Sequence, residues 1–274
     1  MTALDTGTAH LLAEVGDGVG VVTLNRPERR NALSDQMLQA LGGILARFAE
    51  DPDVRCVVVT GAGGAFCAGG DVKGMAERNS SSGPAPSIDE IIARQRLNQR
   101  ATSGLLWSMP KPTVACIPGA AAGAGLSIAL SCDLRYASEG AVLTTAFARI
   151  GFAGDYGGTW FLPRLVGPAK AKELYFFSDR LTAEEAESAG IVNAVFAQDR
   201  LVDEVMDRAR RLASGPSVAY RYMKENINRA AAGADLMDCL DLEVTHHVHT
   251  GLTQDHREAA QAFVEKREPR FRGR

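Results

Sequence analysis

The sequence has no long apolar run, few cysteines and no marked excess of charge of either sign. No segment approaches the length of a transmembrane helix, and residues 1–10 lack the basic and apolar regions of a secretory signal. A net charge of -3 gives no whole-chain field that would attract nucleic acid. We therefore expect a cytoplasmic protein whose partners include neither nucleic acid nor a membrane.

The 5 cysteines and 5 histidines show no spacing that favours a metal site. The cysteines are scattered in apolar or helical contexts and form no C-x-x-C pair. His246, His247 and His249 lie close together, but no H-E-x-x-H motif accompanies them, so a helix surface or an interface explains them better. We expect reduced thiols in the core, no metal and no redox cofactor.

Motifs for a bound nucleotide are missing, and a repeated pattern of strand, glycine-rich loop and helix is present instead. Neither glycine-rich loop contains a clean G-x-G-x-x-G with its acidic partner, and no G-x-x-x-x-G-K-[ST] occurs. Residues 11–15 and 19–24 predict a hairpin, and the β-branched run 54–60 predicts a strand that is covered on both faces. At 274 residues and 46% hydrophobic composition, the chain predicts an α/β fold with a substantial core.

Two glycine-rich loops follow predicted strands and open predicted helices. Residues 63–71 follow the strand at 54–60, and Asp71 is a suitable N-cap for a short helix. Residues 118–125 follow an apolar strand at 114–117 and precede a helix at 126–132. Glycine lets bare backbone amides approach a ligand closely. Two such loops can give two N–H groups to one oxygen, as an oxyanion hole does, although each loop is also explained by a tight turn.

The chain resembles the crotonase (enoyl-CoA hydratase/isomerase) superfamily along nearly its whole length. The matching segments are Asn25-Arg26-Pro27, Asn31-Ala32-Leu33, Phe66-Cys67-Ala68-Gly69-Gly70-Asp71, residues 118–133, Gly157-Gly158-Thr159 and Phe263-Val264-Glu265-Lys266-Arg267. The resemblance implies a crotonase-type spiral of ββα units at residues 1–200, which binds acyl-CoA. It also implies that the helical residues 201–274 assemble trimers or paired trimers. CoA would enter as part of a thioester substrate, with no further cofactor.

Helical periodicity and capping residues predict eight further helices. They span residues 35–50, 88–108, 170–177, 183–189, 201–213, 217–231, 234–251 and 254–266. Residues 79–87 are rich in serine, glycine and proline, and we expect a mobile loop there. The resemblance places this loop and the helix after it over the acyl group.

The resemblance also implies which residues meet the substrate. The amides of Gly70 and Ala124 would hold the thioester oxygen. Contacts to CoA or the acyl group would come from Arg29, Arg30, Ala68, Asp71, Val72, Lys73, Ser127, Phe147, Phe263 and Lys266. Phe263 and Lys266 share one face of the last predicted helix and would reach the CoA of a neighbouring subunit.

The chain departs from the superfamily at the two glutamates that activate water in hydratases. Those positions fall on Ser127 and Phe147, and neither side chain can act as a carboxylate base. Phe147 also makes that wall of the site dry. This departure argues against hydration by the usual pair of glutamates.

Asp155 is the candidate acid–base group that remains. Its run Asp155-Tyr156-Gly157-Gly158-Thr159-Trp160 resembles double-bond isomerases and, most closely, the epoxide and oxepin-CoA isomerases of phenylacetate breakdown. A carboxylate beside an apolar pocket would have a raised pKa, which suits proton transfer. The alternative reading is a loop or helix cap.

Three functions stay open at this point. Double-bond or ring isomerisation by Asp155 is favoured over an enoyl-CoA hydratase with a displaced base and over a catalytically silent acyl-CoA-binding protein. Aryl-CoA dehalogenation is disfavoured, because the histidine that the resemblance expects between residues 88 and 109 is missing.

Overall fold

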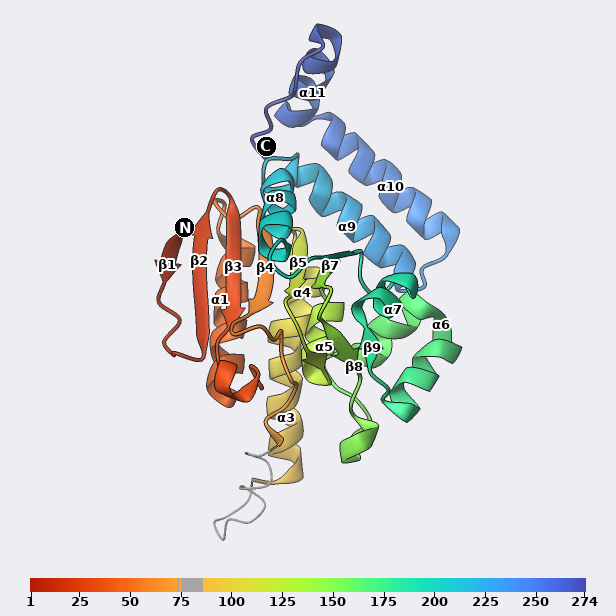
Figure 1. Ribbon diagram of the computed structural model, residues 1–274. Helices are drawn as coiled ribbons and strands as arrows, with labels where there is room; N and C mark the ends of the chain where they lie inside the picture. The colour runs from red at the N-terminus through yellow and green to blue at the C-terminus, as the bar shows by residue number, and fades with distance from the viewer. Residues whose placement is uncertain (73, 75–85) are drawn as a thin grey trace.

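A mixed seven-stranded sheet forms the centre of the computed structural model, which describes residues 1–72, 74 and 86–274. The strand order is β1-β2-β3-β4-β5-β7-β10, with antiparallel pairing from β1 to β3 and parallel pairing from β3 onward (Figure 1). The strands are β1 Thr2–Leu4, β2 Leu11–Gly16, β3 Val19–Leu24, β4 Cys56–Gly61, β5 Thr113–Ile117, β7 Leu134–Ser138 and β10 Ala194–Phe196. The predicted hairpin is therefore confirmed as β2 and β3.

A second, smaller sheet holds the second glycine-rich loop in place. Its strands are β6 Ala121–Ala122, β8 Val142–Thr144 and β9 Leu181–Thr182, in the order β6-β8-β9. Strand β6 lies within the loop and pairs in parallel with β8. The loop is thus fixed by backbone hydrogen bonds on its way from β5 to the next helix.

Helices cover both faces of the central sheet. The α-helices of the described residues are α1 Asp35–Glu50, α3 Ile88–Gln99, α4 Leu105–Ser108, α5 Ala124–Leu130, α6 Gly158–Phe177, α7 Ala183–Ser188, α8 Leu201–Ala213, α9 Ser217–Ala231, α10 Leu236–Gly251 and α11 Gln254–Glu265, of which α10 and α11 extend away from the sheet (Figure 1). Alternate residues of β4 enter two different cores, with Val57 and Val59 on the side of α1 and Val58 on the side of α8. The prediction that this strand is covered on both faces is confirmed, and α8 supplies one of the covers.

Local signals placed several helices correctly, and one helix was missed in part. Ser34 caps α1 by accepting a hydrogen bond from the Met37 amide at 3.2 Å, and α1, α8 and α9 have the predicted bounds. The prediction began α6 at residue 170, whereas α6 begins at Gly158. Pro163 and the break at Gly167, where φ is 78°, explain the error, because both are typical of loops in a sequence.

The helix predicted over residues 88–108 is divided in the structure. A π-helical turn, Arg100–Gly104, separates α3 from α4. Ser87 caps α3 in a reciprocal box with Glu90. The mobile loop predicted at 79–87 falls largely on residues 79–85, which lie outside the described residues, as does most of the short helix predicted after Asp71. In the described part of the chain, no helix is both long and apolar enough to cross a membrane.

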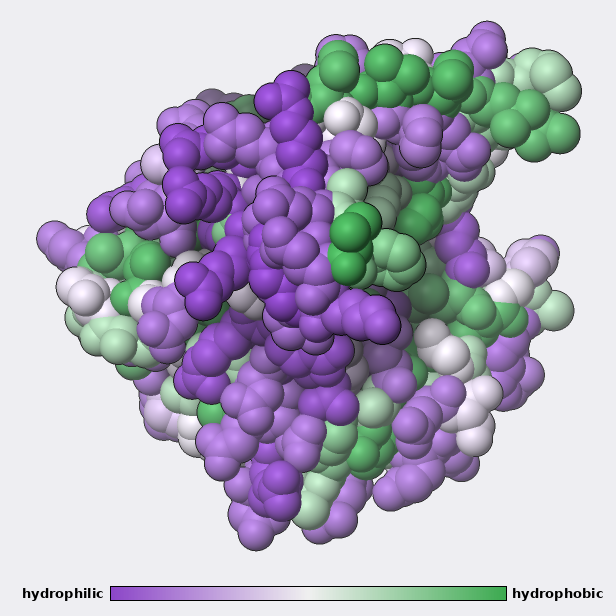
Figure 2. Space-filling view, turned by 90° about the horizontal axis from the view of Figure 1, so that it is seen from above, coloured by the Kyte–Doolittle hydropathy of each residue, from purple (hydrophilic) through white to green (hydrophobic). Residues whose placement is uncertain are grey.

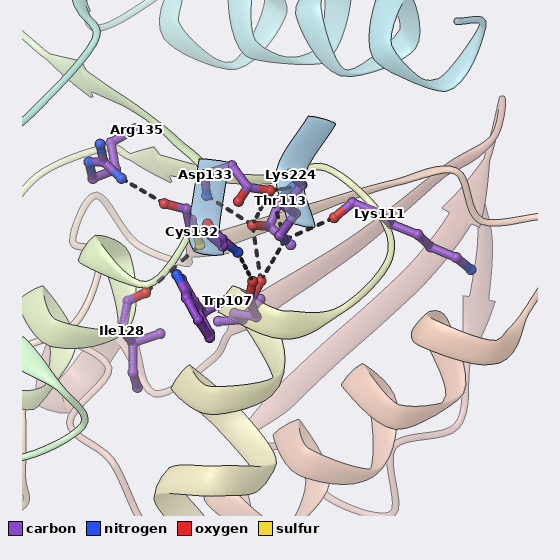
Figure 3. A network of polar contacts seen from close by, with 10 residues as sticks. Trp107, Lys111, Thr113, Ile128, Cys132, Asp133, Arg135 and Lys224 are labelled. Carbon is purple, nitrogen blue, oxygen red and sulfur yellow. Dashed lines mark hydrogen bonds and ion pairs between the residues drawn. The ribbon is translucent and has the colours of Figure 1, made fainter. Parts of the chain in front are cut away.

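A lysine whose side chain is 9% exposed joins α9 to the core (Figure 3). Lys224 Nζ lies 2.9 Å from Asp133 Oδ2 and donates to the carbonyls of Leu106 and Lys111 at 3.0 and 3.1 Å. Thr113 donates to the same Asp133 oxygen from its amide and its hydroxyl, at 2.8 and 3.0 Å. Lys224 therefore joins α9 to the end of α4 through an ion pair and two hydrogen bonds.

Replacing Lys224 with methionine is expected to lower the free energy of unfolding by about 2 kcal/mol, since the Asp133 charge loses its partner and keeps only the Thr113 donors. Urea unfolding at a fixed protein concentration measures the change. Lys172→Met, on an exposed position of α6, is the matched control. A loss no larger than that of the control would contradict the assigned role of Lys224.

Candidate active site

The two glycine-rich loops lie side by side and are joined by backbone hydrogen bonds. The amides of Phe66 and Cys67 donate to the Ala120 carbonyl at 3.0 and 3.1 Å, and the Ala122 amide donates to the Cys67 carbonyl at 2.9 Å. A Cβ on Gly69 would lie 2.8 Å from the Ala122 carbonyl oxygen, and φ at Gly69 is +89°. Only glycine fits there without strain, so residue 69 allows the contact between the loops.

This contact brings the two predicted donors into one region. The same Cβ position on Gly69 lies 3.4 Å from the Ala124 nitrogen, so the backbone just before Gly70 lies against the Ala124 amide. Ala124 is the first residue of α5 and is 3% exposed. Among the described residues, neither the Gly70 amide nor the Ala124 amide donates to an acceptor. A buried amide without an acceptor is rare in proteins and is suited to a ligand oxygen.

Asp155 lies in the turn that leads into α6, and its carboxylate is largely buried. Oδ1 is buried and has no partner among the described residues, whereas Oδ2 lies 3.5 Å from Gln95 Nε2. Burial raises the pKa of Asp155 from 3.8 to about 6. The side chain does not cap α6, whose N-cap is Gly157 without a side-chain hydrogen bond. The capping alternative therefore does not explain this carboxylate.

Two aromatic rings connect the Asp155 turn to the second loop. A Cβ on Gly154 would lie 3.2 Å from the Tyr175 ring, and Tyr175 stacks on Phe147 with centroids 5.8 Å apart and an interplanar angle of 2°. The Phe147 ring in turn lies 3.8 Å from the Cβ position of Gly123, next to Ala124. A continuous wall thus runs from the Asp155 turn to the start of α5.

The pKa shifts of two neighbours agree with this closeness. Burial raises the pKa of Cys67 to about 12, and the negative charge of Asp155 adds to the shift. Burial also raises the pKa of Tyr175 to about 12, again with a contribution from Asp155. Because Cys67 belongs to the first loop and Tyr175 to α6, Asp155 is within electrostatic reach of both sides of the region.

Ser127 and Phe147, the two positions that carry glutamates in hydratases by resemblance, lie beside Gly123. Ser127 is 1% exposed, and its hydroxyl donates to the Gly123 carbonyl at 3.2 Å. Phe147 is 5% exposed. Both positions are close to the Ala124 amide and neither carries a carboxylate. In this region Asp155 therefore provides the carboxylate that the other two positions lack.

The residues predicted to meet CoA at the first loop form a group at its surface. Arg29 and Arg30 are exposed, and the Arg30 carbonyl accepts a hydrogen bond from the Ala68 amide at 2.9 Å. A hydrogen bond from the Gly74 amide holds the pKa of Asp71 below its usual value, and the Arg26 guanidinium adds a smaller effect in the same direction. Arg26 Nη2 lies 3.1 Å from Asp71 Oδ2, a pairing that the sequence analysis missed.

Val72, beside this group, is 46% exposed, and Lys73 lies outside the described residues. Arg26 was overlooked because its role is structural. It also donates to the Ala32 carbonyl at 2.8 Å, and so ties the loop after β3 to Asp71.

Phe263 and Lys266 are not brought to Asp155 within one chain. Phe263 is 85% exposed, and α11 lies at one end of the molecule, away from α6 (Figure 1). The helix ends at Glu265, one residue before the predicted end, and Lys266 is its C-cap with φ of +54°. Any contact of these two residues with a thioester would therefore involve another subunit.

Side chains that could hold a metal do not gather in the described part of the chain. No group of three or more His, Cys, Asp or Glu residues is placed for a metal there. The His246 ring, in the histidine cluster of α10, stacks on Tyr222 at 4.1 Å and lies within hydrogen-bond distance of Asn226. His246 is thus engaged in packing between α9 and α10, whereas His247 and His249 are exposed.

Comparison with known proteins decides the family. The sequence model described as enoyl-CoA hydratase/isomerase matches residues 14–274. The chain belongs to this family. It is 38% identical over 267 residues to the 1,2-epoxyphenylacetyl-CoA isomerase of Escherichia coli, covering 96% of this chain and 98% of that protein. It is 33% identical over 261 residues to the short-chain-enoyl-CoA hydratase of Clostridium acetobutylicum, covering 94% and 95%.

Solved structures of the family confirm the predicted crotonase-type fold. The enoyl-CoA hydratase of Bacillus anthracis superimposes with a TM-score of 0.88 at 32% identity, over 97% of this chain and 100% of that chain. The enoyl-CoA hydratase of Polaromonas superimposes with a TM-score of 0.87 at 32% identity, over 96% and 99%. Family members thus include proteins named as isomerases and proteins named as hydratases.

The raised pKa of Asp155 predicts a measurable effect on stability. An aspartate in the unfolded chain titrates near pH 4, whereas folded Asp155 has a pKa of about 6. The free energy of unfolding of wild type therefore falls as the pH rises from about 4 to about 6, because the buried carboxylate becomes charged, and it stays lowered above that. Asp155→Asn is therefore expected to gain stability over wild type between pH 4 and pH 7, by about 2 kcal/mol. Urea unfolding across this range measures it.

Asp199→Asn removes an exposed carboxylate and is the control. A difference between wild type and Asp155→Asn that stays constant from pH 4 to pH 7 would contradict the burial of the Asp155 charge.

Proposed function

We propose that the protein is an acyl-CoA isomerase that moves a double bond or rearranges a ring in its acyl group. The observation that carries the proposal is the buried Asp155 carboxylate, with one oxygen free of described partners, in the same region as two unsatisfied amides. In this proposal Gly70 and Ala124 form the oxyanion hole and Asp155 is the acid–base group.

The chemistry needs only these groups and the thioester. The ionised Asp155 takes a proton from an acyl carbon, and the electrons of that C–H bond move toward the thioester oxygen, which becomes an enolate. The amides of Gly70 and Ala124 stabilise this charge, and each such donor contributes a factor of about 10² to 10³ in rate. The Asp155 carboxyl then returns the proton to a different carbon. Protons and electrons balance, so the reaction requires no metal or redox cofactor.

The pKa of Asp155 suits both halves of this cycle. Because burial raises it to about 6, the carboxylate is mostly ionised at neutral pH, and its conjugate acid is strong enough to return a proton. The charge also lies in a region of neutral side chains, where Phe147 and Ser127 replace the hydratase carboxylates. These features favour proton transfer within the acyl group over activation of a water molecule.

The relatives include a protein named as an isomerase and several named as hydratases. A protein named 1,2-epoxyphenylacetyl-CoA isomerase shares 38% identity with the chain over nearly its full length. Proteins named as hydratases or probable hydratases match at 33% to 37% identity over more than nine tenths of the chain. Hydration with Asp155 or another group as the base is therefore the second candidate.

Asp155→Asn is expected to slow isomerisation by a factor of about 10² to 10⁴, since it removes the acid–base group. The assay follows 3-enoyl-CoA and 2-enoyl-CoA, and a ring-containing acyl-CoA, by NMR in heavy water. Wild type is expected to move the double bond and take up deuterium. Thioester binding is expected to change by less than about threefold, because the amides are retained.

The same assay separates the alternatives. Steady formation of 3-hydroxyacyl-CoA that survives in Asp155→Asn would identify a hydratase with another base. Tight binding with no turnover and no deuterium uptake across the panel would identify a silent acyl-CoA-binding protein. The exposed Asp199→Asn variant serves again as the control.

We also propose that the protein forms a homotrimer or a hexamer through its C-terminal helices, and that it works in the cytoplasm. A groove of about 480 Å³ lies between α9 and α10. Apolar side chains that are about half exposed or more gather on these two helices, namely Met223, Ile227, Leu236, Met237, Leu240, Val244 and Val248. Figure 2 shows apolar side chains on the side of the molecule where these helices lie. Such a surface fits a partner of the same kind.

Val244→Glu is expected to shift the assembly toward the monomer, because it places a charge in the apolar groove of the proposed interface. Sedimentation velocity measures the mass at several concentrations, and wild type is expected at three or six chains. The control is Glu187→Gln, at an exposed position near the C-terminal end of α7. A monomeric wild type at micromolar concentration would rule out the assembly.

A further inference from the structure

Helix α3 turns its amide side chains toward the protein and its apolar side chains outward. Ile88, Ile91, Ile92 and Leu97 are between 41% and 76% exposed. The half-buried positions are Gln95, Asn98 and Gln99, and no residue of the helix is fully buried. A helix with inward amides needs polar partners on the surface that it covers. The hydrogen-bond partners of these amide side chains therefore indicate the role of α3.

Both inward glutamines contact the turn that carries Asp155. Gln99 Oε1 accepts a hydrogen bond from the Tyr156 amide at 2.8 Å, and Gln95 Nε2 lies 3.5 Å from Asp155 Oδ2. Gln95 also forms a side-chain hydrogen bond that lowers the pKa of Tyr156, which burial raises. Since residues four apart lie on the same helix face, α3 presents the two amides together to Asp155 and Tyr156.

The turn needs such support because its backbone is strained. Tyr156 has φ of +49°, in the left-handed region that side chains such as tyrosine rarely adopt. Its side chain is 2% exposed, so the residue is fixed in the core on one side. The hydrogen bond from its amide to Gln99 fixes it on the other. The direction of the neighbouring Asp155 side chain follows from this backbone conformation.

The glutamines come from a braced part of the chain. The π-helical turn begins directly after Gln99, and its Thr102 and Ser103 hydroxyls donate to the carbonyls of Asn98 and Gln99 at 2.7 and 3.2 Å. Such turns are often found at functional sites. Helix α1 lies close on the other side, where a Cβ on Gly42 would be 3.1 Å from the Ala101 Cβ. The C-terminal half of α3 therefore has little freedom to move away from Asp155.

We propose that Gln95 and Gln99 are positioning residues that select which oxygen of Asp155 carries the proton. Gln99 fixes the backbone of the turn through the Tyr156 amide. Gln95 engages Oδ2, so that Oδ1, which is buried and has no described partner, is the oxygen that takes and returns the substrate proton. The inference rests on the proposed function in one respect, the assignment of Asp155 as the acid–base group.

Among the described residues, Gln95 is the polar side chain that lies within hydrogen-bond distance of the Asp155 carboxylate. The titratable groups that face it are Tyr156 on the same turn, Tyr175 from α6 and Cys67 from the first loop. Burial raises the pKa of all three, so they are neutral where Asp155 titrates. Gln95 is the side-chain donor that the described residues offer to this carboxylate. A donor to the charged form lowers a pKa, and its loss raises it.

Gln95→Leu tests the first half of the proposal, with Gln95→Met as a second variant of closer shape. The rate of deuterium uptake into the substrate is expected to fall about tenfold at pH 6, with KM changed by less than twofold. The acidic limb of the pH–rate profile is expected to move up by about one pH unit. A carbon NMR titration of Asp155, assigned by its absence in Asp155→Asn, reports the same shift without any activity.

Gln99→Leu tests the second half. It leaves the Tyr156 amide without an acceptor, so the rate is expected to fall about tenfold, while the acidic limb stays in place because the Gln95 contact remains. Gln99→Glu keeps an acceptor for the amide and is expected to restore most of the rate. If Gln99 had only a structural role, Gln99→Leu would lower the thermal stability. Gln99→Glu would then not restore the rate when its stability matches that of Gln99→Leu.

Leu97→Gln, on the exposed side of the same helix, is the matched control. The proposal is overturned if Gln95→Leu and Gln95→Met match this control in rate, pH limb and Asp155 titration. It is also overturned if Gln99→Glu is no better than Gln99→Leu. Failure of the proposed function is a separate result, in which Asp155→Asn itself keeps the wild-type rate, and the NMR titration then still decides whether Gln95 acts on Asp155.

Discussion

The hydrogen bonds between the two glycine-rich loops are the constraint on which the rest of the site depends. They join backbone to backbone, from Phe66 and Cys67 to Ala120 and from Ala122 to Cys67, and they require a residue without a side chain at position 69. The sheet makes the contact possible, because β4 and β5 are neighbouring parallel strands whose carboxyl ends meet at one edge. The amides of Gly70 and Ala124 are left over once these bonds are made.

Sequence reasoning was strong where a local rule decides the structure. The Ser34 cap and the periodicity after it placed α1, and the β-branched run placed β4 between two covering layers. It failed at the first half of α6, because a proline and a left-handed glycine within one helix carry the signal of a loop. The family resemblance pointed to Gly70, Ala124 and Asp155, which the structure brings into one region, whereas Phe263 is 85% exposed and lies away from them.

The contacts of Asp155 could not be predicted, although a signal for them is present. Gln95 and Gln99 are spaced to share a helix face, but the isoleucines of α3 form a competing apolar pattern. Periodicity normally assigns the apolar face to the interior, and in α3 the amides face inward instead. Only the position of the Asp155 turn, fixed far away in the sequence, decides which face is inside.

The site combines several groups that cost stability when left unpaired. A buried amide at Ala124, a buried oxygen on Asp155 and a left-handed tyrosine each work against folding by about 1 to 3 kcal/mol. The fold supports them from outside, through α3 at Asp155 and through Lys224 at the far end of α4. Since α3, the π-helical turn and α4 are continuous, the same helical segment is held by α9 at its C-terminal end and contacts the Asp155 turn from its middle. The support of the Asp155 turn therefore includes the C-terminal helices, and the core does not stand apart from them.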